Sequence, residues 1–166
     1  MRTDLAAVHA ALDQLCDPEI PVVSLREMGI LRDVHVSDTG VEVVITPTYS
    51  GCPAMEQIHD DILQSLQQLG VQGQVKTQLA PAWTTDWMSD SAKEKLRAYG
   101  IAPPNCQITN SSQVVRFTRR LQDDVVACPL CGSSNTTITS AFGSTACKAL
   151  CKCLNCQEPF DYFKPY

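Results

Sequence analysis

Long apolar segments are missing from this chain of 166 residues. No apolar run approaches the ~20 residues that a membrane-spanning helix needs. The N-terminal residues also have no long apolar stretch and no small-residue cleavage site of the kind found in signal peptides. These absences argue against an integral membrane protein, and we expect a cytoplasmic protein that does not bind membranes.

Positive charge is also scarce. The chain has 13 Lys and Arg against 18 Asp and Glu, a formal net charge of -5 and a pI of about 5.0. Sequence-independent nucleic-acid binding depends on Lys and Arg side chains that release counterions from phosphates. The one basic cluster, Arg116, Arg119 and Arg120, has no aromatic residue beside it except Phe117. The negative net charge therefore predicts that nucleic acid is not a partner.

Signatures of common catalytic sites are absent as well. We find no Walker loop, no dinucleotide fingerprint, no Ser/His/Asp order and no paired-carboxylate pattern. His9, His35 and His59 are far apart in sequence and near no motif. The sequence favours a protein without catalytic activity of its own, and leaves enzyme activity undecided.

Hydrophobic periodicity predicts a small α+β domain over residues 1–102. Its helices and strands alternate with too few crossovers for a doubly wound sheet, which favours a sheet of three or more strands covered by helices. Ser91 and Glu94 fit a capping box at the start of the last helix. The expected elements are a helix over residues 3–15, a hairpin of strands 30–36 and 41–46, a helix from Pro53 to Gly70, a strand over 75–79 and a short helix ending at Gly100.

Residues 103–126 are rich in Pro, Asn and Ser near their start, and this composition predicts a connector. Val114, Val115, Arg116 and Phe117 could add an edge strand to a sheet. A separate C-terminal domain follows at residues 127–166.

Cysteines dominate this C-terminal domain. Six of the nine cysteines lie between Cys128 and Cys156, and two C-x-x-C pairs stand out, Cys128 with Cys131 and Cys153 with Cys156. Four thiolates suit tetrahedral zinc at about 2.3 Å, and a hairpin between the pairs would bring them together. So small a module needs the metal in order to fold. The spacing predicts a structural zinc ribbon, with an iron-sulfur cluster, a single iron or disulfides as alternatives.

Three further cysteines have no clear place in this prediction. Cys147 and Cys151 lie on the expected hairpin, where they could exchange with the four predicted ligands, although we favour small buried core residues. Cys106 belongs to the connector, and the sequence assigns it no role.

A second group of interest is formed by Asp17, Glu19 and Cys52. Cys52 is expected at or beside the N-cap of a helix, where unpaired N–H groups favour a thiolate. Nearby carboxylates would oppose this ionisation, and the sequence does not decide which effect is larger. The three residues could bind iron or a cluster transiently. Alternatively, Asp17 caps a turn, Glu19 is solvated and Cys52 is a buried small residue.

Trp83 and Trp87 are four residues apart in a polar loop. They could form an exposed aromatic patch that contacts a partner. More often two such residues cover the edge of a small core, and we favour that interpretation.

Several motifs together resemble a known family. Residues 17–21, 28–30 and 46–53 are similar to the small α+β domain of SufT-like iron-sulfur assembly factors. With residues 81–88, 142–150 and 158–164, nearly the whole chain resembles the PaaD (PaaJ) family, which is encoded with the bacterial phenylacetyl-CoA oxygenase. The motifs depart from the family pattern in the connector and at Cys151.

The resemblance implies a role in aerobic phenylacetate degradation. It implies an accessory factor that helps to mature an iron-sulfur or iron site of an oxygenase component, with the ferredoxin-like reductase as the expected partner. In this family Cys52 would be the functional cysteine, with Asp17 and Glu19 as its acidic loop and a cluster or iron held transiently. The alternative is a structural or electron-transfer subunit of the oxygenase complex. A homodimer is also left open.

Overall fold

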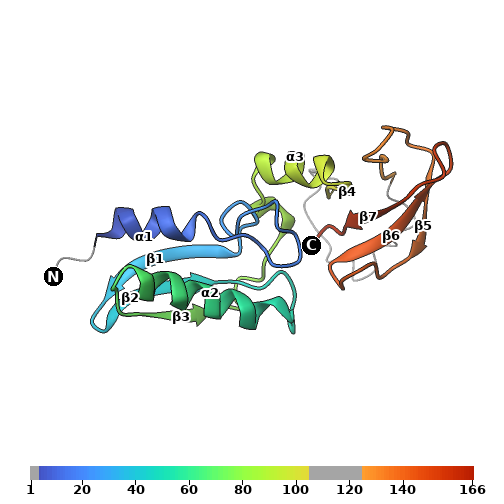
Figure 1. Cartoon of the computed structure of the whole chain (residues 1–166). Coiled ribbons are helices and arrows are strands. Elements are labelled where there is room, and N and C mark those ends of the chain that lie inside the picture. Colours follow the sequence, from blue (N-terminus) through green and yellow to red (C-terminus); the bar gives the residue numbers. More distant parts are fainter. Residues whose placement is uncertain (1–3, 105–124) are drawn as a thin grey trace. The chain divides into compact units, whose positions relative to one another are not determined.

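The computed structural model describes residues 4–104 and 125–166, in which the chain forms two compact units, Met1–Ala92 and Lys93–Tyr166 (Figure 1). Over these described residues, no helix is both long enough and apolar enough to cross a membrane. The mixture of small sheets and covering helices confirms the predicted α+β class.

The first unit is built on a three-stranded sheet of order β1-β2-β3. Strands β1 (Leu31–Ser37) and β2 (Gly40–Ile45) form the predicted antiparallel hairpin. Helix α2 (Ala54–Gln68) then carries the chain to β3 (Gly73–Thr77), which pairs with β2 in parallel. The predicted hairpin, helix and third strand are confirmed.

Helix α1 (Leu5–Leu12) is shorter than predicted. The Asp4 side chain accepts hydrogen bonds from the backbone N–H groups of Ala6 and Ala7, and this N-cap fixes the start of the helix. Val8 and Leu12 point into the core.

The core of this unit lies between the sheet and the helices. Alternate residues of β2 point to one face of the sheet, and α2 presents a stripe of buried residues at helical spacing. Gly73 allows close packing, because a Cβ there would lie 2.6 Å from the Leu66 Cδ1 atom of α2. The fully buried residues of this layer include Val41, Val43, Ile45, Ile58, Ile62 and Leu66.

The tryptophan loop packs on the segment before β1. The Trp83 indole N–H donates to the carbonyl oxygen of Met28 at 2.9 Å, and Trp83 is only 4% exposed. The Arg32 guanidinium lies 3.6 Å from the centre of the half-buried Trp87 ring. These contacts support the interpretation that the pair covers a core edge, and partner contact through Trp87 stays a prediction.

Helix α3 (Asp90–Ala98) follows the short 3-10 helix η1 (Thr85–Trp87). The predicted capping box at its start is wrong, because the Ser89 hydroxyl accepts the N–H of Ala92 at 3.0 Å. The Ser91 hydroxyl instead donates to the Glu27 carboxylate at 2.8 Å. The cap therefore lies two residues earlier, and Ser91 serves a tertiary contact.

The second unit contains a four-stranded sheet of order β4-β7-β6-β5. Strands β5 (Thr136–Ser140) and β6 (Lys148–Cys153) form the predicted hairpin. Strand β7 (Pro159–Phe163), which the sequence did not reveal, pairs with β6 in the antiparallel sense. Strand β4 (Ile101–Ala102) pairs with β7 in parallel, although it falls within the range predicted for the first domain.

One small cluster of buried side chains forms the core of this unit. It joins Ala102 and Val126, from either side of the residues outside the description, to residues of β6 and β7 such as Ala149, Phe160 and Tyr162. Several of its members are cysteines. The edge strand predicted at residues 114–117 and Cys106 lie outside the described residues.

Candidate metal centre and the Cys52 loop

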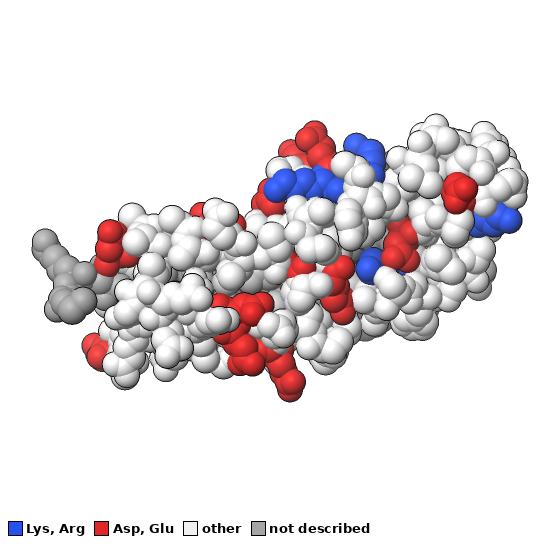
Figure 2. Space-filling view, in the orientation of Figure 1, with Lys and Arg blue, Asp and Glu red and all other residues white. Residues whose placement is uncertain are grey.

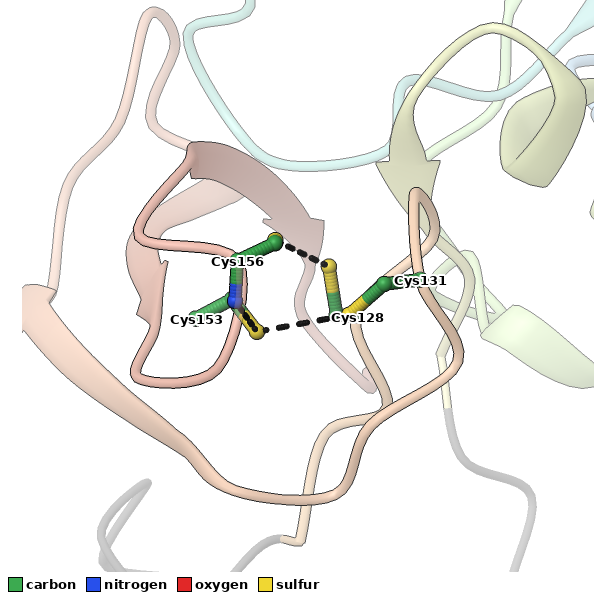
Figure 3. A group of neighbouring side chains, drawn as sticks. All are labelled: Cys128, Cys131, Cys153 and Cys156. Atoms are coloured by element: carbon green, nitrogen blue, oxygen red, sulfur yellow. Dashed lines mark hydrogen bonds between the residues drawn. The ribbon is translucent and has the colours of Figure 1, made fainter.

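The four predicted zinc ligands converge in the second unit. Figure 3 shows the four cysteines converging, with Cys128 and Cys131 on one loop, Cys153 at the end of β6 and Cys156 in the turn that follows. The ligand atoms of the four all lie within 4.8 Å of one another. The sulfur of Cys128 is 3.8 Å from that of Cys156, and the sulfur of Cys131 is 3.6 Å from that of Cys153. We call these residues the four-cysteine group.

The distances fit one closed tetrahedral site. With zinc–sulfur bonds of about 2.3 Å, the edges of a tetrahedron of sulfurs are about 3.8 Å long. Disulfide sulfurs would be only about 2.05 Å apart, and these cysteines are free thiols in the structure. The group would bind zinc through all four sulfurs and leave no ligand position open for a substrate.

Each C-x-x-C pair is shaped by its own backbone. In the first pair, the N–H of Gly132 donates to the Cys128 carbonyl at 2.9 Å, and the positive φ of Gly132, 75°, turns the chain away after Cys131. In the second pair, the Cys156 N–H donates to the Cys153 sulfur at 3.5 Å. Such N–H···S contacts favour a thiolate.

The electrostatics of the group call for a cation. The backbone N–H of Cys156 is the largest of several influences that lower the pKa of Cys153 to about 6. The N–H of Glu158 also favours the Cys156 thiolate, but burial and the neighbouring thiols outweigh it and raise the pKa of Cys156 to about 12. One thiolate forms readily and discourages the next, so four thiolates at this spacing require a bound cation.

Cys147 and Cys151 lie outside the group. Both are buried, and the Cys147 sulfur contacts the Thr145 hydroxyl at 3.0 Å. Burial, followed by the charge of Asp161, raises the pKa of Cys151 to about 11. This supports their interpretation as small core residues.

Cys52 sits just before α2 in the first unit. Pro53 is the N-cap residue, so Cys52 lies beside the cap as expected, while the proline is one position earlier than predicted. The Cys52 N–H donates to the Tyr49 carbonyl at 3.3 Å, and the Cys52 carbonyl accepts from Met55 at the same distance. The loop thus holds a half-buried thiol at the start of the helix.

The sequence left open whether Cys52 is a thiolate or a neutral thiol, and the structure favours the neutral thiol. Burial is the largest influence and raises the pKa of Cys52, and the charges of Glu19 and Asp17 raise it further. The Ala54 N–H and the Tyr49 hydroxyl act in the opposite direction and are outweighed. Tyr49, three residues before the cysteine, is a neighbour that sequence reasoning missed.

The same interactions show that the acidic loop lies close enough to Cys52 to influence it. Asp17 is buried and closes a turn, because one carboxylate oxygen accepts from the N–H groups of Glu19 at 2.7 Å and of Ile20 at 3.2 Å. Glu19 is half-buried rather than fully solvated. Asp17 therefore caps a turn, as the simpler interpretation proposed, and also acts on the thiol.

Asp17, Glu19 and Cys52 do not form a ready-made chelate. Across residues 4–104 and 125–166, the four-cysteine group is the one set of three or more His, Cys, Asp or Glu ligand atoms that converges at metal-binding distance. In the first unit the structure brings together one thiol and a negative environment. Figure 2 shows Asp and Glu side chains over α1 and α2 on the face in view, and both acidic and basic side chains over α3.

Comparisons with known proteins agree with this division. A family model described as an iron-sulfur cluster assembly protein matches residues 5–77, and one described as the PaaD zinc beta ribbon domain matches residues 111–164. The chain is 46% identical over 158 residues to an Escherichia coli protein named as a putative subunit of 1,2-phenylacetyl-CoA epoxidase, covering 95% of this chain and 90% of that one. The chain belongs to the PaaD family. The membership inferred from the motifs is thereby confirmed.

Shorter relatives align with about half of this chain. It is 38% identical over 84 residues to an Fe-S protein maturation auxiliary factor of Porphyromonas gingivalis, covering 48% of this chain and 78% of the relative. A second such factor, YitW of Bacillus subtilis, is 32% identical over 89 residues, covering 52% and 86%. A solved DUF59 domain of Bacillus anthracis matches with a TM-score of 0.50 and 27% identity, covering 55% of this chain and 89% of that one.

Proposed function

We propose that this protein is an accessory factor of the phenylacetyl-CoA oxygenase system that assists assembly of an iron-sulfur cluster or iron site in an oxygenase component. The ferredoxin-like reductase is the client we propose. Iron or a cluster is cargo in this scheme and is bound through Cys52 of the first unit, while zinc in the second unit is structural.

The observation that carries this proposal is the surroundings of Cys52. Buried neighbours and two carboxylates raise the pKa of its thiol, so a proton competes with the cargo for the sulfur at neutral pH. Binding iron displaces that proton to solvent and forms one iron–sulfur bond, and release reverses both changes. Competition of this kind makes binding weak, which suits a carrier that must give its cargo away.

The acidic surroundings have a second effect. Met1–Ala92 contains four Lys and Arg against thirteen Asp and Glu, a negative excess that favours cations near the surface. Asp17 and Glu19 oppose a bare thiolate but stabilise a thiolate paired with a metal cation. Since Cys52 supplies one sulfur, the other ligands of the cargo come from the donor, the client or a second copy of the chain.

The names of the relatives point the same way. The Porphyromonas gingivalis and Bacillus subtilis proteins are named as Fe-S protein maturation auxiliary factors, and the Escherichia coli relative is named as a component of an epoxidase. A chain that joins an assembly domain to a PaaD zinc ribbon supports a maturation factor dedicated to one oxygenase system.

The decisive experiment replaces Cys52 by Ser in cells that are given phenylacetate together with a second carbon source, so that growth does not depend on the oxygenase. We expect a folded protein, and a reductase that is depleted of iron and of its visible cluster absorption. Cys16→Ser is the matched control, because Cys16 is a free and exposed cysteine of the same unit. Iron content of the purified reductase measures both effects.

A reductase fully loaded in the Cys52→Ser cells would reject the proposal. Equal losses in the Cys52→Ser and Cys16→Ser cells would also reject it, since general thiol chemistry would then explain the result. The double substitution Asp17→Asn with Glu19→Gln tests the role of the two carboxylates while the sulfur is kept. We expect it to reduce iron loading of the reductase less than Cys52→Ser does.

A further inference from the structure

The β5–β6 hairpin ends in a turn that the zinc site does not use. We call residues 141–147 the hairpin tip. Thr136 pairs with Cys153 at one end of the hairpin and Ser140 pairs with Leu150 at the other, so the tip is at the far end from the four-cysteine group. Phe142 in this turn is 67% exposed, and Leu150 of β6, which pairs with Ser140, is 37% exposed. Burying this ring in a pocket of a partner would be favourable.

The hairpin tip is fixed by several hydrogen bonds. The Gly143 N–H donates to the Lys148 carbonyl at 2.7 Å, and the Ser140 hydroxyl donates to the Phe142 carbonyl at 2.8 Å. The Ser144 hydroxyl donates to the Asp161 carboxylate at 2.9 Å. The turn that presents the ring is therefore ordered before any partner arrives, which removes part of the entropy cost of binding.

Packing beneath the tip strengthens this order. A Cβ on Gly143 would lie 2.6 Å from the Asp161 Oδ1 atom, so the turn fits closely against β7. The Lys148 side chain is 5% exposed, and its ammonium lies 3.6 Å from the other oxygen of Asp161. The two charges neutralise each other, so this pair of a buried lysine and a half-buried aspartate supports the turn without adding net charge to it.

A second lysine gives the exposed ring a positive neighbour. The Lys164 ammonium is 4.6 Å from the centre of the Phe142 ring and donates to the Ala141 carbonyl at 3.1 Å. Within the described part of the chain, no Asp or Glu forms an ion pair with Lys164. The unit is basic as a whole, with nine Lys and Arg against five Asp and Glu in Lys93–Tyr166. The charge complement of this surface is a carboxylate.

We propose that the hairpin tip is the docking anchor for a protein partner that offers an apolar pocket for Phe142 and a carboxylate at its rim for Lys164. Rigid aromatic side chains that insert into pockets contribute most of the energy of many interfaces, and the carboxylate would pair with a cation that contacts a carbonyl and a ring. Taking an oxygenase component as this partner rests on the proposed function.

The test measures binding of the purified full-length zinc protein to purified oxygenase components, including the apo-reductase, at low and high salt. We expect one component to bind, Phe142→Ala to weaken that binding at least tenfold and Phe142→Leu to weaken it less. Lys164→Gln should weaken binding and flatten its salt dependence. Leu79→Ala is the matched control, because Leu79 is a 64% exposed apolar residue of the first unit.

Three results would overturn the docking anchor. The first is that Phe142→Ala binds as tightly as the wild type, and the second is that the wild type binds no oxygenase component. The third is a wild-type dimer in sedimentation that dissociates when Phe142 is replaced by Ala, which would assign the surface to a second copy of the chain. Zinc content and melting temperature of each variant must match wild type, as expected for an exposed side chain.

Cys52→Ser separates this proposal from the proposed function. If it retains binding but fails to load the reductase, both proposals stand. If it loads the reductase normally while Phe142→Ala loses binding, the anchor stands and the Cys52 function falls. If Cys52→Ser fails to load while Phe142→Ala binds as wild type, only the docking anchor falls.

Discussion

The four-cysteine group and Cys52 use the same side chain in opposite surroundings. In the second unit, four sulfurs within 4.8 Å of one another make a closed tetrahedral site with no ligand position left over. In the first unit, one half-buried thiol near two carboxylates has a raised pKa and, among the described residues, belongs to no set of three or more converging ligands. Ligand number and proton competition, more than the identity of the ligand, would therefore separate the closed four-cysteine site from the transient site that we propose at Cys52.

Removing zinc should have the largest effect. Structural zinc contributes on the order of 10–16 kcal/mol to folding of small modules. A chelator, or Cys131→Ala, should therefore unfold β5 to β7 and leave the first unit folded. Nuclear magnetic resonance of the full chain would show the two sets of signals separately. Intact signals from β6 after complete loss of metal would contradict the comparison, as would iron in place of zinc in the purified protein.

Asp17→Ala should have the next largest effect, now on the Cys52 side. It removes the acceptor of two backbone N–H groups, and we expect a loss of about 1–2 kcal/mol in the free energy of unfolding of the first unit. Asp17→Asn keeps an acceptor oxygen and should lose less. Urea denaturation measures both, and equal losses would show that the charge matters more than the turn.

Cys151→Ala should cost about 1 kcal/mol, because Cys151 is a buried core residue and not a ligand. The variant should retain one zinc per chain. Cys153→Ala, two residues away on the same strand, is the comparison and should lose the metal. Zinc analysis after gel filtration distinguishes them, and loss of metal from Cys151→Ala would enlarge the ligand set.

Glu19→Gln should have the smallest effect. Its charge raises the pKa of Cys52, so its removal lowers that pKa and increases the thiolate fraction below it. We expect alkylation of Cys52 at pH 8 to become about twofold faster. Peptide mass spectrometry follows the alkylation of Cys52 alone. The alkylation rates of the wild type and the variant should converge at a pH above the Cys52 pKa of both proteins. A slower reaction would mean that Glu19 does not act through its charge.

The four-cysteine group could be predicted almost completely from sequence, whereas the surroundings of Cys52 could not. Two C-x-x-C pairs define their own ligands, because each pair sets a local turn and only one ion fits between them. The state of Cys52 depends on the sum of burial, two carboxylates, a backbone N–H and the Tyr49 hydroxyl. Spacing indicates the signs of some of these influences but does not give their relative sizes.

Among the secondary structures, β7 shows why one strand was missed. Pro159 begins it, close to the end of the chain, and a proline next to a metal-binding pair favours a turn. Its alternation was nevertheless present in the sequence, since Phe160 and Tyr162 are buried and Asp161 between them is not. The cap of α3 was misplaced because Ser89 and Ser91 both satisfy the local rule, and only the contact of Ser91 with Glu27 decides between them.

The short strand β4 has a practical consequence for dissecting the protein. Ile101 and Ala102 pair with Asp161 and Tyr162 of β7, and Ala102 shares a core cluster with Val126. A C-terminal fragment that starts at residue 127 would lack this outer strand and expose the backbone edge of β7 to water. A C-terminal fragment that starts at residue 93, within α3, keeps the sheet whole. The two halves are therefore better separated within α3 than just before the cysteine-rich tail.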